Sequence, residues 1–293
     1  MTTSSIFDAQ SSHSDAFLTV LIHNNEDDRL PAARQTAGLV QTNLAQMGIR
    51  SECIEICEQP DLPMRSLREL VRRDLHWNKI FIESELLRHG KMRLRQPNFV
   101  SGRLREFVRH VRLGRLDRSA LINSNFALTL KHLKAWALCI EFGFQGIVVL
   151  ESDAILSETS ARRFREVLND RDLVGLWTGT EPHVASLAGP FSLTAVQGQI
   201  RALKETDSAR IFWPGFVNTT CAYFMNSAMV RRQEELTCAH PLRALVAVDA
   251  LINANLQEMY RSRQRATVGH VRNFVVEHGS LTGIVSRSAG IGA

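Results

Sequence analysis

A continuous apolar run near the middle of the chain ends at two acidic residues. The run covers residues 146–150, Gly-Ile-Val-Val-Leu, and is followed directly by Glu151, Ser152 and Asp153. Apolar residues that do not alternate with polar ones are typical of a β-strand that is covered on both faces. Such strands lie inside parallel or mixed sheets with helices on both sides. The run therefore predicts an α/β fold.

The two carboxylates after this strand predict a binding site. Ligands of open α/β sheets collect at the carboxyl ends of the strands. If the chain stays extended, Glu151 and Asp153 point to the same side, because side chains of a strand repeat every two residues. Two oxygen ligands of this kind suit Mg²⁺ or Mn²⁺. The alternative is a solvated acidic turn, or a cap of the helix predicted over residues 157–170.

The N-terminal part of the chain predicts a strand, a helix and a second strand. Residues 17–22 form the first strand, Pro31 begins the helix, and residues 51–56 form the second strand. Nucleotide-binding α/β domains often begin in this order, and the turn at Asn24 lies where a base or ribose would bind. The sequence has neither a dinucleotide-binding glycine motif nor a P-loop.

A helix-patterned segment that ends near Gly143 precedes the acidic strand. Together with the strand, it resembles glycosyltransferase family 25, the lipopolysaccharide and collagen-type sugar transferases. In that family a Ser-His-containing helix with a downstream Trp precedes a strand that ends in Glu-Asp-Asp. The corresponding residues here are Lys131-His132, Ala135-Trp136 and Glu151-Ser152-Asp153.

The resemblance continues through residues 218–226, Asp249 and residues 275–280, and it departs from the family at two positions. Lys131 stands where the family has serine, and Ser152 stands where it has the middle acid. The second change leaves one charge fewer for a divalent ion. A neighbouring family with the same GT-A-like core is the alternative assignment.

The resemblance implies a GT-A-like (Rossmann-like) α/β fold, in which helices flank a mixed, mostly parallel sheet. We expect a single domain over residues 17–288, with a flexible N-terminus at 1–16 and a flexible tail at 289–293. Within the domain, residues 59–118 are expected to form a helical, basic insertion that serves as a lid or an acceptor module.

The resemblance also implies a reaction. It predicts a metal-dependent, inverting transfer of a sugar from a nucleotide-sugar donor, UDP-linked, to a surface glycan or lipopolysaccharide-type acceptor. Asp153 is the expected main ligand of Mn²⁺ or Mg²⁺. Glu151 is expected to be a second ligand, or to orient hydroxyls of the donor. His278 would complete the metal sphere or contact the phosphates, because histidine and carboxylate together suit Mn²⁺.

Candidate contacts to the donor follow from the same resemblance. They are Asn24 and Arg29, for which an ordinary polar turn is the alternative, and His132. Trp136 lies one helical turn after His132, and bracing of the sheet is the interpretation favoured for it.

Asp249 is the predicted general base. It lies in an apparent helix over residues 241–256, on a stripe of apolar residues that is expected to face inward: Leu242, Leu245, Ile252 and Leu256. A buried carboxylate needs a partner or a changed pKa, and enzymes accept that cost at working sites more often than elsewhere. A salt bridge to an arginine is the structural alternative. The family resemblance implies an acidic residue here and favours the catalytic interpretation.

Composition sets further limits. The chain has 293 residues, of which 44% are hydrophobic, enough for one elaborated α/β domain. No run approaches the roughly 18 apolar residues that span a bilayer, and residues 1–15 lack the apolar part of a signal peptide. We therefore expect a soluble, cytoplasmic protein. Its five cysteines, without zinc-type spacing, are expected to be reduced thiols.

Basic residues at positions 65–118 account for most of the net charge of +5. Such a segment attracts anions, such as a nucleotide diphosphate, a phosphorylated glycolipid acceptor or the inner face of an anionic membrane. Solvated helix faces are the alternative. Nucleic acid is not favoured as a partner, because the segment shows no RNA-binding signature, helix-turn-helix or zinc-finger pattern.

Two stretches after the acidic pair also have predicted structures. Residues 173–177 are predicted to be a strand, and residues 178–199 a mobile loop of the kind that closes over a donor sugar. Surface filler is the alternative for the loop.

Three classes of function are compatible with these features. The first is the glycosyltransferase, which we favour. The second is a catalytically weakened module of the same fold, suggested by Ser152, which binds a donor or a glycan without turnover. The third is a basic adaptor for nucleic acid or a membrane surface, whose binding would depend steeply on salt.

Overall fold

The computed structural model describes the α/β core of the chain. The described residues are 14–24, 28–57, 119–188, 202–213, 215–217, 220–240, 244, 247–272 and 275–278. The predicted basic insertion, the C-terminal tail and most of the predicted N-terminal flexible segment lie outside these residues. So does the second half of the predicted loop at 178–199.

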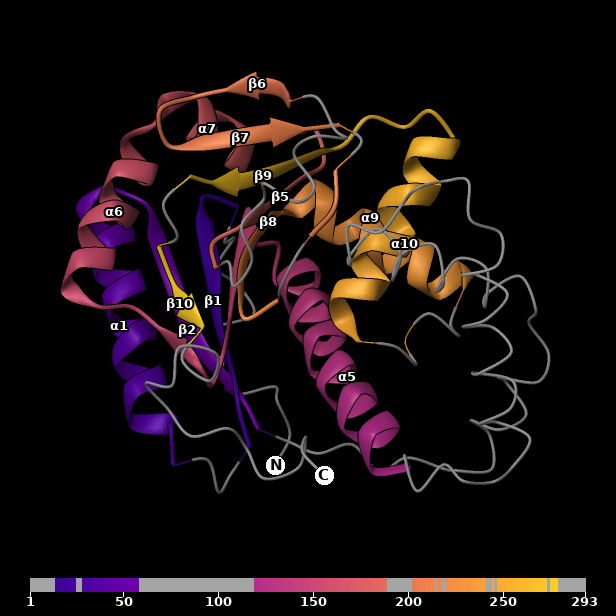
Figure 1. Ribbon diagram of the computed structural model, residues 1–293, viewed down its shortest axis with the longest axis horizontal. Coiled ribbons are helices and arrows are strands. Elements are labelled where there is room, and N and C mark those ends of the chain that lie inside the picture. The colour runs from indigo at the N-terminus through magenta and orange to yellow at the C-terminus, as the bar shows by residue number, and fades with distance from the viewer. Residues whose placement is uncertain are drawn as a thin grey trace, which may run out of the picture.

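Eight strands form one sheet in the order β2-β1-β3-β8-β5-β9-β7-β6 (Figure 1). Their bounds are β1 Ala16–Ile22, β2 Arg50–Ile56, β3 Gly146–Glu151, β5 His183–Ser186, β6 Ala202–Glu205, β7 Ala209–Phe212, β8 Ala222–Asn226 and β9 Thr267–Val271. A separate two-stranded sheet pairs β4 (Ala154–Ile155) with β10 (Glu277–His278).

The main sheet is mixed, as the sequence predicts. The central strand β3 runs parallel to β1 and antiparallel to β8. Two strands, β7 and β8, run in one direction. The other six run in the opposite direction: β1, β2, β3, β5, β6 and β9. The expected α/β fold with a mostly parallel, Rossmann-like sheet flanked by helices is therefore confirmed.

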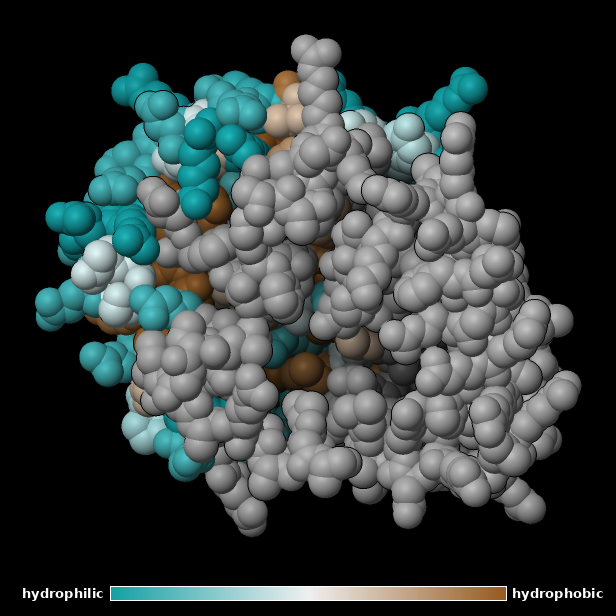
Figure 2. Space-filling view, in the orientation of Figure 1, coloured by the Kyte–Doolittle hydropathy of each residue, from teal (hydrophilic) through white to brown (hydrophobic). Residues whose placement is uncertain are grey.

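Helices cover both faces of this sheet, as Figure 1 shows. One layer consists of α1 (Leu30–Gln46), α6 (Glu158–Asn169) and α7 (Arg171–Trp177). The other consists of α5 (Ser119–Glu141), α9 (Ser227–Ala239) and α10 (Val248–Arg261). Hydrophilic residues cover the outer sides of α1 and α6 (Figure 2).

The central strand explains the continuous apolar pattern of the sequence. Ile147 and Val149 of β3 pack into the core beneath α5, α9 and α10. Val148 and Leu150 pack into the core beneath α1, α6 and α7. Because every residue of the run meets a core, no position along it is left for a polar side chain.

Gly146 begins this strand because no other residue fits there. A Cβ atom added to it would lie 2.8 Å from the ring of Phe224 and 2.9 Å from the carbonyl oxygen of Met225, both on the neighbouring strand β8. The ring of Phe224 in turn stacks on Trp177, with the ring centroids 4.4 Å apart. The glycine thus allows the close approach of β3 and β8, and the ring of Phe224 that lies against it also contacts α7 through Trp177.

The predicted strand at 173–177 is wrong, because these residues belong to helix α7. The carboxylate of Asp170 accepts hydrogen bonds from the backbone N–H groups of Asp172 and Leu173, which caps the helix. Leu173 and Trp177 lie one helical turn apart and are both buried. Their spacing fits a helix, and the short apolar run by itself does not separate the two possibilities.

Part of the predicted loop at 178–199 is also wrong. Residues 183–186, His-Val-Ala-Ser, form the buried strand β5, which lies between β8 and β9 in the sheet. A strand of four residues that contains a histidine and a serine carries too little apolar pattern to be recognised.

The other elements that the sequence predicts agree with the structure to within a few residues, except at α10. Strands β4, β6, β7 and β9 were not predicted. Ser157 caps α6 as predicted, and the strand over 222–226 precedes helix α9. The predicted helix at 241–256 begins later, because α10 starts at Val248. Leu242 and Leu245 of the predicted stripe lie outside the described residues.

All five cysteines carry free thiols. In the part of the chain that the structure describes, no helix combines the length and the apolar character that are needed to cross a membrane.

Two buried histidines lie on adjacent strands of the sheet. Nδ1 of His183 on β5 is 2.7 Å from Oγ1 of Thr267, and Nε2 of His270 on β9 donates to the carbonyl oxygen of Phe216 at 2.8 Å. Burial lowers the pKa of His183 to about 3 and that of His270 to about 4. The unfolded chain therefore binds protons that the folded chain excludes, and stability is lost as the pH falls below about 6.5.

We expect the free energy of unfolding to fall by about 1.4 kcal/mol per pH unit for each of these histidines between about pH 6 and pH 4. Urea denaturation at several pH values measures this slope. His183→Gln removes one titrating group and should make the slope shallower. An identical slope in His183→Gln and the wild type would contradict the assignment.

Candidate functional site

The acidic pair lies at the carboxyl end of β3, next to the end of β1. Glu151 is the last residue of β3 and pairs in register with Ile22, the last residue of β1. Its backbone N–H donates to the carbonyl oxygen of Cys221 at 2.8 Å, which ties it to the segment before β8. Ligands of open α/β sheets bind at this edge.

The chain does not stay extended after Glu151. Ser152 and Asp153 form a turn before β4, so the alternation argument does not apply to this pair. Both carboxylates nevertheless lie near the thiol of Cys221, whose pKa is affected by each of them. The structure therefore brings Glu151 and Asp153 together around Cys221, by a turn instead of by extended backbone.

The thiol of Cys221 is held in its neutral form. Burial raises its pKa well above the usual range, and the negative charges of Asp153 and Glu151 and a hydrogen bond with Asp153 raise it further. The positive charge of Arg29 acts in the opposite direction on the same thiol. Arg29, at the start of α1, thus lies within electrostatic range of Cys221.

His132 reaches Glu151 from helix α5. Glu151 follows Ile147 and Val149 in the alternation of β3, and its carboxylate faces the side of the sheet that α5 covers. Nε2 of His132 lies 3.3 Å from Oε1 of Glu151, at ion-pair distance but outside hydrogen-bond angles. His132 is fully buried. Its predicted direct contact with the donor stays a prediction, and its observed neighbours are protein groups.

His278 is brought to the acidic turn by the small second sheet. His278 of β10 pairs with Ala154 of β4, the residue directly after Asp153. The side chain of His278 lies outside the described residues. Among the side chains that the structure describes, no three of the types His, Cys, Asp and Glu form a group able to hold a metal ion. The metal-ligand roles of Asp153, Glu151 and His278 therefore stay predictions.

The turn after β1 is fixed by a buried lysine. Nζ of Lys131 donates to the carbonyl oxygen of His23 at 2.6 Å and to Oδ1 of Asn24 at 3.0 Å. Asn24 itself is exposed. Lys131, where the resembled family has serine, thus holds the predicted donor-contact residue Asn24 in the turn after β1, the strand whose last residue, Ile22, pairs with Glu151.

A second set of contacts holds the same turn from β2. Nε2 of His23 lies 3.2 Å from Oε2 of Glu55. Arg34 donates to the same carboxylate from Nε to Oε1 at 2.6 Å and from Nη2 to Oε2 at 2.8 Å. The hydrogen bond from Arg34 is the main cause that lowers the pKa of Glu55. No role was predicted for His23, Glu55 or Lys131, because the contacts that join them link residues far apart along the chain.

Asp249 lies in the first turn of α10 and is buried. Its carboxylate accepts a hydrogen bond from the backbone N–H of Ala250 at 2.9 Å. Asn253, one turn later on the same face, binds both backbone groups of Val217, at 2.7 and 2.9 Å. Val217 begins the stretch that leads to Cys221. The inward position predicted for Asp249 is confirmed, and its role as a base stays a prediction.

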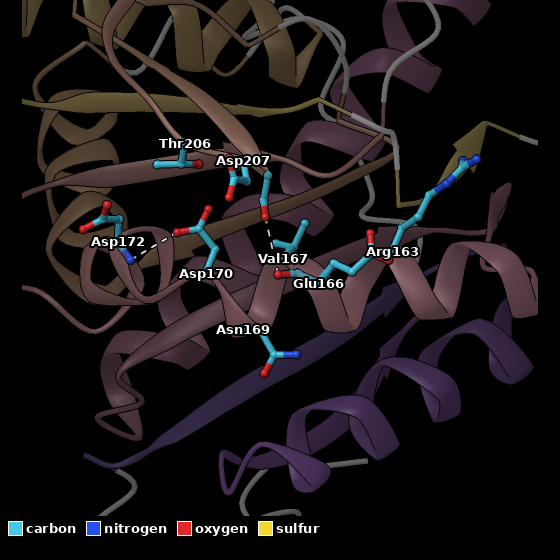
Figure 3. A pocket seen from close by; sticks show the side chains of 9 residues that line it. Arg163, Glu166, Val167, Asn169, Asp170, Asp172, Thr206 and Asp207 are labelled. Atoms are coloured by element: carbon cyan, nitrogen blue, oxygen red, sulfur yellow. Dashed lines mark hydrogen bonds between the residues drawn. The ribbon is translucent and has the colours of Figure 1, made fainter.

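A polar pocket of about 660 Å³ lies elsewhere, under the β6–β7 turn, as Figure 3 shows. Its lining comes from α6, α7 and that turn: Arg163, Glu166, Val167, Asn169, Asp170, Asp172, Thr206, Asp207 and Ser208. Burial opposes the ionisation of Asp170, but hydrogen bonds with Thr206, Leu173 and Ser208 keep its pKa below the usual value. The contact with Leu173 caps α7, whereas those with Thr206 and Ser208 join the helix cap to the β6–β7 turn. The pocket shares no residue with the acidic turn.

Comparison with known proteins assigns no family to the chain. A scan against models of protein families finds no match, and a search of curated proteins finds none either. A function for this chain therefore has to be proposed from its own residues and from their arrangement at the edge of the sheet.

Lys131→Met keeps the length of the side chain and removes its N–H donors. The carbonyl oxygen of His23 would lose a buried partner, which costs about 1–3 kcal/mol of stability. Urea denaturation measures the loss. Lys204→Met is the matched control, because Lys204 is exposed and its ion pair with Asp172 lies at the surface, where such pairs contribute little. Equal effects of the two substitutions would show that the contacts of Lys131 are not the cause.

Proposed function

We propose that this protein is a metal-dependent glycosyltransferase that uses a nucleotide-sugar donor. One observation carries the proposal: the turn with Glu151 and Asp153 lies at the carboxyl ends of β1 and β3, and the backbone of His278 pairs beside it. A site that combines carboxylates with a histidine at this edge is suited to a diphosphate with its cation. The resemblance of the acidic strand and its preceding helix to glycosyltransferase family 25 supports the same reading.

The residues present are compatible with a hard divalent cation. Glu151 and Asp153 offer oxygen ligands, which Mg²⁺ and Mn²⁺ prefer. The nearby thiol of Cys221 keeps its proton, because burial and the two carboxylates raise its pKa. Asp153, Glu151 and His278 are the residues that would hold the cation, and the bound cation would offset charge on the leaving diphosphate.

The donor would bind across the ends of β1 and β3. The order β1-α1-β2 is that of a nucleotide-binding unit. Asn24 is exposed on the turn after β1 and is available to a base or a ribose. Arg29 places positive charge near the acidic turn, where phosphates are expected. A UDP-sugar is the donor class that the family resemblance implies.

The proposed chemistry is a single displacement. A hydroxyl oxygen of the acceptor forms a bond to the anomeric carbon of the sugar, and the bond from that carbon to the diphosphate oxygen breaks. The carboxylate of Asp249 takes the proton of the attacking hydroxyl, and the nucleoside diphosphate leaves with the bonding electron pair. Attack from the face opposite the leaving group inverts the configuration at the anomeric carbon.

A surface glycan or a lipopolysaccharide-type glycolipid is the proposed acceptor. The basic segment at residues 65–118 would attract the phosphates of such a lipid, or the anionic surface that carries it. Peripheral association with a membrane is therefore part of the proposal. A module that binds the donor without turnover is the second candidate, because Ser152 replaces an acid at the turn.

Asp153→Ala tests the metal site. We expect the wild type to melt at a higher temperature when Mn²⁺ and a UDP-sugar are added together. A ligand at 100 times its Kd raises the free energy of unfolding by about 2.7 kcal/mol. Asp153→Ala should abolish this gain. Asp172→Ala should keep it, since Asp172 is exposed and pairs with Lys204 near the β6 edge of the sheet. Thermal melts over a panel of nucleotide sugars, with and without Mn²⁺, measure the effect. An undiminished gain in Asp153→Ala would refute the site.

Asp249→Asn tests the base. The amide oxygen can still accept the hydrogen bond from Ala250, so the fold and the binding of the donor should be retained. Transfer to acceptor should fall by about 10²–10⁴-fold, the usual contribution of a general base. Product formation from a labelled donor measures transfer, and Glu258→Gln on the same helix is the control. Unchanged turnover would remove Asp249 from the mechanism, and donor binding without turnover in the wild type would favour the binding module.

A further inference from the structure

Three fully buried side chains are linked by short polar contacts, and the last of them, His132, lies at ion-pair distance from Glu151. Nε1 of Trp136 donates to the hydroxyl oxygen of Tyr223 at 3.1 Å. That oxygen lies 2.8 Å from Nδ1 of His132. Nε2 of His132 lies 3.3 Å from Oε1 of Glu151. None of the three rings has solvent access, so the contacts between them are closed to water.

The elements that carry these groups explain why they meet. His132 and Trp136 lie one turn apart on α5 and share a face. Tyr223 lies on β8 directly opposite Val149 of β3, on the side of the sheet that α5 covers. The rings of His132 and Tyr223 are stacked, with an interplanar angle of 19°. All positions are therefore set by regular secondary structure.

The direction of the hydrogen bonds can be assigned from the chemistry of the groups. The indole of Trp136 can only donate, so the oxygen of Tyr223 accepts from it. Burial raises the pKa of Tyr223 well above its usual value, so the phenol keeps its own proton. The nitrogen nearest to that proton is Nδ1 of His132. An imidazole that accepts at Nδ1 carries its hydrogen on Nε2, the atom that faces Glu151.

We propose that Tyr223 and His132 are positioning residues, which hold the carboxylate of Glu151 in one orientation through a fixed Nε2-H tautomer of His132. This inference deepens the proposed function, on which its meaning for metal and donor binding rests. Partners of this kind behind a ligating carboxylate typically change metal affinity by about 10–100-fold when they are removed.

The tautomer can be measured without any ligand. We expect ¹⁵N NMR of the histidine-labelled full chain at pH 8 to show His132 protonated at Nε2 and unprotonated at Nδ1. His132→Gln assigns the resonances. Tyr223→Phe should remove the hydrogen bond at Nδ1 and shift that nitrogen. Protonation of His132 at Nδ1 in the wild type would overturn the proposal, whether or not the protein binds a metal.

The consequence for Glu151 is tested with Mn²⁺ titrations. Tyr223→Phe removes one oxygen from a fully buried ring, and we expect a 10–100-fold loss of Mn²⁺ affinity in a protein that still melts cooperatively. The chain contains two tyrosines, and Tyr260→Phe, at an exposed ring, should bind Mn²⁺ like the wild type. His132→Gln, which retains an N–H donor, should lose less affinity than His132→Leu.

The outcomes separate this proposal from the proposed function. A wild type that binds neither Mn²⁺ nor a nucleotide sugar would refute the proposed function, and the tautomer would then decide the positioning roles by itself. A folded Tyr223→Phe variant that binds Mn²⁺ as tightly as the wild type would refute the positioning roles and leave the proposed function intact.

Discussion

Burial of β3 on both faces is the constraint on which the rest of the structure depends. Ile147 and Val149 fill one core, and Val148 and Leu150 fill the other. A shift of the strand by one residue would exchange these two sets and misfit both cores at once. The register of β3 is therefore fixed, and with it the point at which Glu151 leaves the core and the side of the sheet toward which its carboxylate points.

Polar groups at the end of this strand are supported by the same rigid elements. α5 supplies Lys131 to the turn after β1 and His132 to Glu151. β8 supplies Tyr223, and the segment before it supplies Cys221. Neighbouring positions of a single helix thus serve two different strand ends. Groups fixed by helices and strands hold their geometry more closely than groups on loops, which is what a site for a charged ligand requires.

The sequence predicted the central strand, the acidic turn and the opening of the fold, because each is encoded by neighbouring residues. It did not predict β5, whose four residues owe their place to the strands on either side. Tyr223 was passed over because it looks like an ordinary apolar residue of a strand. Its hydroxyl gains a role only when α5 packs over β8, and that contact joins residues that are 91 positions apart. Long-range pairings of polar atoms leave no local pattern in a sequence.

The small sheet of β4 and β10 has a consequence for the order of events in the making of this protein. Its two strands join residues 154–155 to residues 277–278, which are separated by most of the second half of the chain. During synthesis, the acidic turn emerges from the ribosome long before the segment that pairs beside it. The nascent protein can pair β1, β2 and β3 early, but this corner stays incomplete until residues 277–278 have also emerged.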